Sequence, residues 1–564
     1  MSLIHELEAL QEERGHLDAA SLRDLAHRLA VPLYRLQELV SFYPHFRTEP
    51  PAALEVHVCR DMSCHVSGGA AGLRERLEAA FGDRKDVRVR ETSCLGVCEL
   101  APAVRVNGTP ARATDPAALA AAVADGPLPH PRAAPRAWQA DPYGGDRDGA
   151  YHTFREVLAR PDREAALDDV IAELEASGLR GMGGAGFPTG LKWKLVRAER
   201  AAPKYVVCNA DESEPGTFKD RVILEQLPYL VLEGMMLGGL VVGAERGIVY
   251  LRHEYGAARE ALTAELARAR DTGWLGEDIL GSGFSFDVEI FVSPGGYILG
   301  EETALLEALE DRRGEPRNKP PFPGQKGLHG RPTLINNVET FAWVPGVLAG
   351  GADAWKARGV NGCAGLKAMA VSGHVERPGV YEIPLGTTVA ELIDMAGGVK
   401  DGRPLKGFAP GGASSHFLPA AKADTPIDFG ALADAGSMMG SGALVVVAEG
   451  TDMLPLAANV VRFFRDESCG KCVPCRDGSQ KAAAMLERAM ADGTPLDAAA
   501  LEKLEELLVE TSICGLGYVV LNPLVSAARH WPDEFPGLGD GRGGGGGGRN
   551  GTGDGSGNGK GGAA

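Results

Sequence analysis

Eight of the ten cysteines fall into two tight groups, and their spacing carries the clearest chemistry in the sequence. The first group is Cys59, Cys64, Cys94 and Cys98, and the second is Cys469, Cys472, Cys475 and Cys514. Thiolates at such spacings bind metal ions or iron–sulfur clusters. Zinc held by four thiolates is the common alternative. The C-x4-C and C-x3-C pairs of the first group differ from zinc-ribbon pairs, and the C-x2-C-x2-C run of the second suits a cubane, so we favour a cluster at both.

A second stretch whose residues could bind a ligand runs from Gly181 to the acidic loop after residue 208. Five glycines in residues 181–190 allow backbone N–H groups to approach a phosphate or a flat ring. Three of them satisfy G-x-G-x-x-G, but that fingerprint must follow a strand and open a helix. A helical stretch, Leu167–Glu175, precedes it here, so we reject a Rossmann turn. A glycine-rich loop without a ligand remains the alternative.

This stretch resembles the flavin-binding loop of the NADH-oxidising, FMN-containing subunit of respiratory complex I. The same module occurs in NAD-dependent formate dehydrogenases and NAD-reducing hydrogenases. Segments 295–304, 319–323 and 334–340 match it in the same order, and with the cysteine motifs the resemblance covers nearly all of residues 1–537. Met182 departs from the complex I form, where we expect Arg.

The resemblance implies a set of residues that hold FMN and NAD(H). These are Gly181, Gly183, Gly184, Gly186, Phe187, Lys192, Asn209, Asp211, Glu214, Tyr297, Gly300, Glu301, Glu302, Lys319, Phe322, Asn336, Asn337 and Thr340. It places the FMN phosphate near the amides of Asn336 and Asn337 and the side chain of Thr340. The ribityl chain and ring would meet Lys192, Asn209 and Asp211, and the dinucleotide would meet Glu214, Glu302 and Lys319.

Several of these residues could instead have a purely structural role. NADH would stack over the flavin between Phe187 and Phe322, but both rings could instead be core aromatics. Glu301 and Glu302 could instead be the solvated first turn of a helix over Thr303–Leu309. Four motifs in family order favour the ligand interpretation.

The elements that position these residues indicate a multidomain α/β protein. We expect an N-terminal helical hairpin segment (1–50), a thioredoxin-like [2Fe-2S] domain (51–125) and a linker (126–149). A central non-Rossmann FMN-binding α/β domain (150–360) should follow, and then a β-grasp, ubiquitin-like soluble-ligand-binding domain with a structural role (361–450). The chain should end with a helical bundle that holds the [4Fe-4S] cluster (451–537) and a disordered Gly-rich tail (538–564).

Composition limits the class of partner and compartment. The formal charge of −18 argues against nonspecific nucleic-acid binding. No apolar run has the length of a membrane span, and no signal peptide opens the chain, so we expect a cytoplasmic protein without direct membrane insertion. Clustered cysteines in such a chain indicate cluster binding rather than disulfides.

The resemblance implies an NADH-oxidising or NAD+-reducing subunit with FMN, a [4Fe-4S] and a [2Fe-2S] cluster, and no catalytic side chain. The sequence lacks a recognisable site for formate or hydrogen, so a partner subunit must carry one. The motifs around Cys469 and Cys514, and Met182, favour the β subunit of a formate dehydrogenase with a molybdopterin α subunit, and a further [2Fe-2S] subunit is an optional partner. Alternatives are a hydrogenase diaphorase, a complex I subunit, and a scaffold that has lost flavin.

Overall fold

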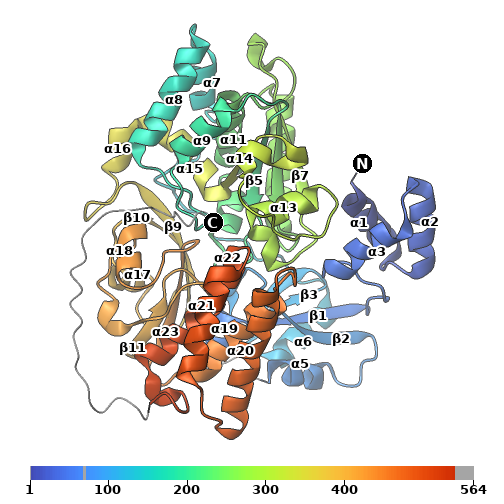
Figure 1. Cartoon of the computed structure of the whole chain (residues 1–564). Helices are drawn as coiled ribbons and strands as arrows, with labels where there is room; N and C mark the ends of the chain where they lie inside the picture. The colour runs from blue at the N-terminus through green and yellow to red at the C-terminus, as the bar shows by residue number, and fades with distance from the viewer. Residues whose placement is uncertain (1, 68–71, 540–564) are drawn as a thin grey trace. The chain divides into compact units, whose positions relative to one another are not determined.

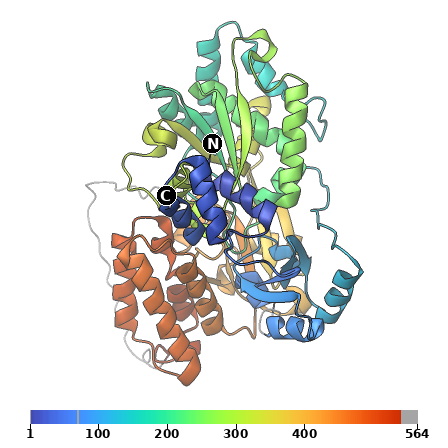
Figure 2. The same ribbon diagram turned by 90° about the vertical axis from the view of Figure 1, so that its right-hand side faces the viewer.

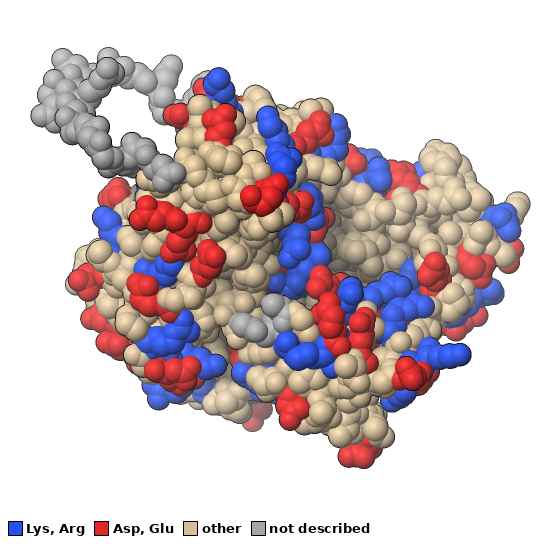
Figure 3. All heavy atoms as spheres, turned by 90° about the horizontal axis from the view of Figure 1, so that it is seen from below, with Lys and Arg blue, Asp and Glu red and all other residues tan. Residues whose placement is uncertain are grey.

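The computed structural model describes residues 2–67 and 72–539. The described residues divide into two compact units, before and after the boundary between residues 451 and 452, which are described separately. Of the predicted Gly-rich tail, 538–564, all but the first two residues lie outside the described residues. On the face drawn in Figure 3, Lys and Arg side chains lie among Asp and Glu side chains, so both signs of charge are spread over it.

The first unit begins with three short helices rather than a two-helix hairpin. They are α1 (Leu3–Arg14), α2 (Ala19–Leu29) and α3 (Leu33–Phe42). Asp18 caps α2 by accepting hydrogen bonds from two backbone N–H groups, as the N-cap preference predicts. The helices contact the central domain, since Ser2 Oγ donates to Asp311 at 2.6 Å and Tyr43 Oη to the Arg312 carbonyl at 2.5 Å (Figure 1).

The thioredoxin-like domain is a small sheet covered by helices. Its strands are β1 (Leu54–Cys59), β2 (Val87–Thr92), β3 (Ala103–Val106) and β4 (Thr109–Arg112), in the order β2-β1-β3-β4. Its helices are α4 (Met62–Val66), α5 (Leu73–Phe81) and α6 (Pro116–Asp125). Only β1 and β2 pair in parallel. Alternate apolar residues of β1 pack with Leu73 and Leu77 in its core.

The central domain contains a four-stranded, all-parallel sheet. Its strands are β5 (Tyr205–Ala210), β6 (Arg246–Leu251), β7 (Asp287–Val292) and β8 (Thr333–Asn337), in the order β7-β6-β5-β8. The principal helices are α8 (Arg163–Ser177), α9 (Thr189–Ala198), α10 (Lys219–Gln226), α11 (Pro228–Val242), α12 (Gly256–Asp271), α13 (Glu302–Leu309) and α15 (Val338–Gly350). Every residue of α11 is buried, which explains why it is apolar on all sides. Numbered by their sequence within this sheet, the strands have the order 3-2-1-4, which matches the first four strands of a doubly wound sheet of order 3-2-1-4-5-6. The glycine loop, however, lies before β5 instead of after it.

The β-grasp-like domain is a mixed five-stranded sheet. Its strands are β9 (Leu366–Gly373), β10 (Gly379–Pro384), β11 (Leu405–Ala409), β12 (Leu418–Pro419) and β13 (Ala443–Ala448), in the order β10-β9-β13-β11-β12. Helices α17 (Val389–Met395) and α18 (Phe429–Asp434) accompany it. Its buried side chains belong to the same continuous hydrophobic core as those of the central domain, including Trp343, Leu366 and Leu444.

The second unit is helical, like the bundle predicted for residues 451–537. It contains α19 (Met453–Asp466), α20 (Val473–Asp492), α21 (Ala498–Thr511), α22 (Gly515–Val519) and α23 (Asn522–His530), which pack alongside one another (Figure 2). Leu501, Leu504 and Leu508 form the buried face of α21. In the described ranges of both units, no helix is long and apolar enough to span a bilayer.

Candidate functional site

The glycine loop connects α8 to α9 and closes on itself. Gly178 ends α8 in the left-handed conformation. The Gly181 N–H donates to the Phe187 carbonyl at 2.8 Å, and the Gly186 N–H donates to the Gly181 carbonyl at 3.1 Å. Gly186 has φ +62, and a Cβ there would lie 2.8 Å from the Phe429 ring. A side chain at Gly186 is therefore excluded by the β-grasp domain as well as by the backbone.

The glycine loop lies against the first turn of α15. The Met182 N–H donates to Thr340 Oγ1 at 2.9 Å, and a Cβ on Gly183 would lie 3.0 Å from Asn337 Cβ. The Met182 side chain points into the core and is 1% exposed. Unpaired N–H groups at a helix start attract anions, so a side-chain-free loop over this helix N-terminus fits a phosphate.

The side-chain amides of both asparagines are already engaged. Trp193 Nε1 donates to Asn336 Oδ1 at 3.2 Å, and Asn337 Nδ2 donates to Asp220 Oδ2 at 2.6 Å. Asn337 Oδ1 also caps α15 by accepting from the Glu339 N–H at 3.0 Å. Because the Asn337 side chain is held by Asp220 and by the cap of α15, we expect a phosphate at this position to meet backbone N–H groups rather than that side chain.

Three residues predicted to hold the rest of the flavin lie around the carboxyl end of β5. Lys192 Nζ donates to the Ile335 carbonyl at 3.1 Å, and Asn209 Nδ2 donates to the Gly300 carbonyl at 2.8 Å. Burial lowers the pKa of Lys192, and the Glu302 carboxylate opposes that shift. Burial raises the pKa of Asp211 to about 7, although the positive charge of the Arg252 guanidinium acts to lower it. The loop, Lys192 and these polar groups together fit FMN.

The predicted dinucleotide residues form an ion cluster. Lys319 Nζ lies 2.8 Å from Glu302 Oε1 and 3.0 Å from Glu301 Oε1. Glu301 also caps α13, since its Oε2 accepts from the N–H groups of Thr303 and Ala304, so it has a structural role as well. Burial disfavours the charge on Glu302, but Lys192 and Lys319 lower its pKa below the ordinary value.

The remaining dinucleotide candidates differ in exposure. Phe322 is 43% exposed, which is unusual for an aromatic ring, and Phe187 is half-buried. Glu214 is buried, and its carboxylate accepts from Tyr297 Oη at 2.5 Å and from Ser414 Oγ at 2.6 Å. The exposed Phe322 ring suits stacking on a ligand, whereas Glu214 is already bound by hydroxyl groups.

The first cysteine group comes together at one end of the thioredoxin-like sheet. Cys59 ends β1, Cys64 lies in α4, and Cys94 and Cys98 flank a loop, with Sγ atoms 3.5 Å apart. All four thiols are buried. Hydrogen bonds from the Cys59 and Cys98 thiols, with the Arg252 guanidinium, hold the pKa of Cys94 well below its usual range, despite burial. Four converging thiols fit a [2Fe-2S] cluster.

The second cysteine group lies at two helix starts of the C-terminal unit. Cys475 is in the first turn of α20, and Cys514 is the N-cap of α22. Burial raises the pKa of Cys475 to about 11, against a hydrogen bond from Ser468. A Cβ on Gly517 of α22 would lie 2.4 Å from Ser512 Cβ and 3.4 Å from Cys475 Cβ, so the start of α22, which Cys514 caps, packs next to Cys475. The arrangement fits a [4Fe-4S] cluster.

Comparison with known proteins agrees with these sites. The family described as the Nuo51 FMN-binding domain matches residues 174–346, and the thioredoxin-like [2Fe-2S] ferredoxin family matches 1–126. The iron–sulfur binding region of NADH-ubiquinone oxidoreductase-F matches 455–537, and the SLBB domain matches 369–417.

Individual relatives extend the match. The F 2 subunit of the NADH-quinone oxidoreductase of Rhizobium meliloti is 43% identical over 69% of this chain and 91% of its own length. The chain belongs to the family of NADH-quinone oxidoreductase F subunits. The NADP-reducing hydrogenase subunit HndC of Solidesulfovibrio fructosivorans is 43% identical over 65% of this chain and 75% of its own. A solved chain of an NAD+-reducing [NiFe]-hydrogenase, in the air-oxidized state, has a TM-score of 0.81 and 32% identity, covering 94% of this chain and 92% of that one.

As a member of this family, the chain is an NADH oxidoreductase component that uses FMN, NAD(H), a [2Fe-2S] and a [4Fe-4S] cluster. The thioredoxin-like domain is fused to it at the N-terminus. Multidomain α/β architecture and the β-grasp-like region are confirmed by the same matches.

Sequence reasoning missed several buried charges around the flavin site. Lys219 Nζ lies 2.6 Å from Asp220 Oδ1 and 3.0 Å from Glu339 Oε2, and Lys367 Nζ also contacts Glu339. All four side chains are almost fully buried. Lys367 comes from the β-grasp domain, so this domain supplies a charge beside the phosphate position.

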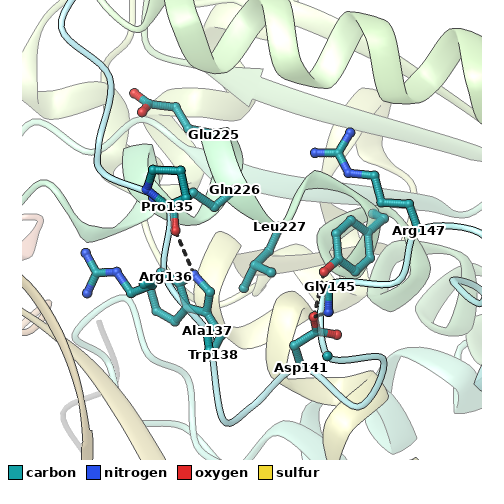
Figure 4. A pocket seen from close by; sticks show the side chains of 12 residues that line it. Pro135, Arg136, Ala137, Trp138, Asp141, Gly145, Arg147, Glu225, Gln226 and Leu227 are labelled. Carbon is teal, nitrogen blue, oxygen red and sulfur yellow. Dashed lines mark hydrogen bonds between the residues drawn. The ribbon is translucent and has the colours of Figure 1, made fainter.

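A cavity of about 340 Å³ is lined by other residues than these. It is lined by the linker, including Arg136, Trp138 and Arg147, and by the junction of α10 and α11 (Figure 4). Trp138 Nε1 donates to Gln226 Oε1 at 2.9 Å, and Tyr229 Oη donates to Asp141 Oδ2 at 2.6 Å. The predicted linker is therefore anchored to the central domain by specific hydrogen bonds.

Proposed function

We propose that this chain exchanges two electrons with NAD(H) at a bound FMN and exchanges them singly with a partner subunit through its clusters. The observation that carries the proposal is the glycine loop, which is closed over the N-terminus of α15 beside the Lys192–Glu302–Lys319 cluster. FMN, when bound, supplies the hydride chemistry and the change from two-electron to one-electron transfer.

The role of the chain's own residues is to bind the flavin and to orient it. Gly181, Gly183, Gly184 and Gly186 leave the loop backbone open to the flavin, and Thr340 fastens the loop to α15. Lys192, Asn209, Asp211 and Gly300 line the carboxyl end of β5 and the adjoining turn. These contacts restrict the flavin to one orientation, and orientation is the main protein contribution to a cofactor-borne reaction.

The dinucleotide would enter past Phe322 and stack between it and Phe187. Lys319 would attract the pyrophosphate, while Glu302, held by Lys319, would accept hydrogen bonds from the ribose. Glu214 and Tyr297 support the acidic loop through their mutual hydrogen bond. We assign no general acid or base, since no Ser-His-Asp set or H-E-x-x-H motif is apparent in the sequence.

We further propose an NAD-dependent formate dehydrogenase as the parent enzyme, with this chain as its β subunit. The motifs around Cys469 and Cys514, and Met182, favour that class. The partner would then be a molybdopterin α subunit, with a further [2Fe-2S] subunit as an optional member. The diaphorase role of an NAD-reducing hydrogenase is the second candidate, because the similarity to the hydrogenase chain extends over 94% of this chain. A complex I subunit is the third.

We place the chain in the cytoplasm. Its cysteines are all free thiols in the structure, and clusters of free thiols persist in reducing compartments.

The test is anaerobic co-purification with partner subunits, followed by NAD+ reduction assays with formate and with hydrogen. Formate-dependent activity with molybdenum or tungsten supports the first candidate, and hydrogen-dependent activity with nickel supports the second. NADH oxidation with ferricyanide by the chain alone tests the shared reaction. A flavin-loaded wild type with no NADH oxidation overturns the proposal.

A further inference from the structure

Two arginines of the central domain reach the cysteine loop of the thioredoxin-like domain. Arg252, which follows β6, donates from Nη2 to the Cys94 carbonyl. Arg221, in α10, donates from Nε to the Gly96 carbonyl at 3.3 Å. Both arginines are buried, with 4% and 5% exposure respectively. The [2Fe-2S] ligand loop is therefore held from outside its own domain.

Arg252 also holds the acidic loop beside the flavin position. Its Nη1 donates to the Glu212 carbonyl at 2.6 Å, and Glu212 lies next to the predicted flavin residue Asp211. Its Nε lies 2.8 Å from Glu254 Oε2. One guanidinium thus joins the cluster loop to the flavin loop, and its planar set of donors suits several acceptors at once.

Gly96 permits this close approach. Its φ is +69, and a Cβ there would lie 2.7 Å from Tyr255 Oη and 3.0 Å from Arg252 Nη1. The loop between Cys94 and Cys98 therefore packs directly on the arginine, with no room for a side chain.

The two arginines differ in how far their charges are balanced. Arg221 contacts two carboxylates, Glu99 and Glu225. Within the described residues Arg252 forms an ion pair with one carboxylate, that of Glu254, and its guanidinium contacts the carbonyl of a cluster ligand. Arg252 is therefore the cation whose charge acts most directly on Cys94.

We propose that Arg252 is a positioning residue of the [2Fe-2S] centre that raises its reduction potential and ties it to the flavin loop. This inference rests on the proposed function, since it requires a cluster on the first cysteine group. Reduction adds one electron, and hence one negative charge, to a centre already held by four thiolates. A buried guanidinium favours that added charge, because there is little solvent to screen it.

The test is an anaerobic redox titration of the full chain. Electron paramagnetic resonance monitors the [2Fe-2S] signal, and the titration gives the midpoint potential of that cluster. Arg252→Gln should lower the equilibrium constant for cluster reduction about tenfold or more, and tenfold is about 59 mV for a one-electron couple. Arg252→Lys keeps the charge and should recover most of the potential. Glu254→Gln removes the opposing charge and should raise the potential.

Arg270→Gln is the matched control. Arg270 also combines an ion pair, with Asp287 at 2.9 Å, and a hydrogen bond to a carbonyl, that of Val288. Arg270 lies in the last turn of α12, and its partners Asp287 and Val288 begin β7. That end of the parallel sheet is opposite to the end of β6, which Arg252 follows. Arg270→Gln should leave the potential unchanged.

The signs of the shifts decide the outcome. An unchanged potential in Arg252→Gln with two irons retained at this site overturns the inference, as do shifts of the same sign in Arg252→Gln and Glu254→Gln. If Arg252→Gln loses the cluster, Glu254→Gln decides, and a potential that does not rise overturns the inference. A wild type without the [2Fe-2S] signal overturns the cluster assignment itself, and with it this inference.

Discussion

The backbone N–H of Met182 donates a 2.9 Å hydrogen bond to Thr340 Oγ1, joining residues that are 158 positions apart in the sequence. The bond fixes the glycine loop on α15 while the Met182 side chain faces the core. We therefore expect the loop backbone, rather than a side chain at position 182, to determine FMN binding.

Gly183→Val should remove FMN from the protein. Its Cβ would lie 3.0 Å from Asn337 Cβ, and a β-branched side chain would also occupy the face of the loop that a flavin approaches. Met182→Leu, which nearly conserves volume, should retain FMN. The measurement is flavin released per chain on denaturation. Equal loss in both variants would contradict the loop geometry.

Anaerobically purified protein should contain about six iron atoms per chain, four from a cubane and two from a rhombic cluster. Cys475→Ala should lose about four of them and keep its flavin, because Cys475 is in the second unit. Cys363→Ala is the control, since Cys363 belongs to neither group. Stoichiometric zinc in the wild type would show that one cysteine group is wrongly assigned.

Glu302→Gln should relax a preference for NADH over NADPH. The 2′-phosphate of NADPH adds roughly −1.5 to −2 charges near neutral pH. Glu302 repels it, but Lys319, at 2.8 Å from Glu302, offsets part of the repulsion, so we expect a preference of about tenfold or more. The variant should mainly improve kcat/KM for NADPH with an artificial acceptor.

Glu301→Gln is the matched control for that experiment. It weakens the cap of α13 and should lower stability while leaving the NADH to NADPH ratio close to that of the wild type. If the ratio responds to Glu301 and not to Glu302, the assignment of the ribose carboxylate is reversed.

The cysteine motifs and the central strands were predictable because their signals are local. Residues 205–208 and 247–251 are apolar runs, and residues 288–292 are apolar except for Glu289. The structure extends each segment by only one or two residues as β5, β6 and β7. The short strand β4, Thr109–Arg112, was missed, because its pairing with β3 defines it rather than any apolar pattern.

The buried cations were beyond sequence reasoning. Lys and Arg are rarely fully buried unless paired, so a single sequence favours exposure for Lys367 and Arg252. Their partners, Glu339 and the Cys94 carbonyl, belong to other domains, and no spacing rule connects such residues. The alternative of a solvated turn at Glu301, which we did not favour, does not describe the structure, in which Glu301 caps α13 and pairs with Lys319.

Lys367→Met should destabilise the first unit by about 3 to 5 kcal/mol, because it leaves Glu339 buried with one cation fewer. Lys400→Met, an exposed lysine of the same domain, should change stability little. The measurement is thermal unfolding of the flavin-free protein. Comparable stability of the two variants would show that Lys219 alone balances Glu339.

Glu233→Gln should stabilise the protein increasingly as pH rises. Glu233 lies in α11 and is fully buried, and burial raises its pKa from 4.5 to about 7. A carboxyl group that binds its proton more tightly when folded contributes stability below pH ~4.5, which is lost as pH rises through about 7. The gain for the variant at pH 8 should be about 3 kcal/mol at most.

Thermal midpoints of the wild type and Glu233→Gln at pH 5.5 and pH 8 test this expectation. The exposed Glu245→Gln serves as the control, and its difference from the wild type should not change with pH. A gap between wild type and Glu233→Gln that narrows as pH rises would contradict the assigned direction of the shift.

The contacts between the β-grasp domain and the central domain limit where this chain can be truncated and which of its domains can be exchanged by recombination. Ser414 binds Glu214, Ser441 Oγ lies 2.7 Å from Thr217 Oγ1, and Lys367 pairs with Glu339. A fragment ending near residue 360 would lose all three contacts and expose one side of a shared hydrophobic core. Recombination between genes can therefore exchange the flavin domain and the β-grasp domain only as one block, and a minimal flavin-binding fragment must extend to about residue 451.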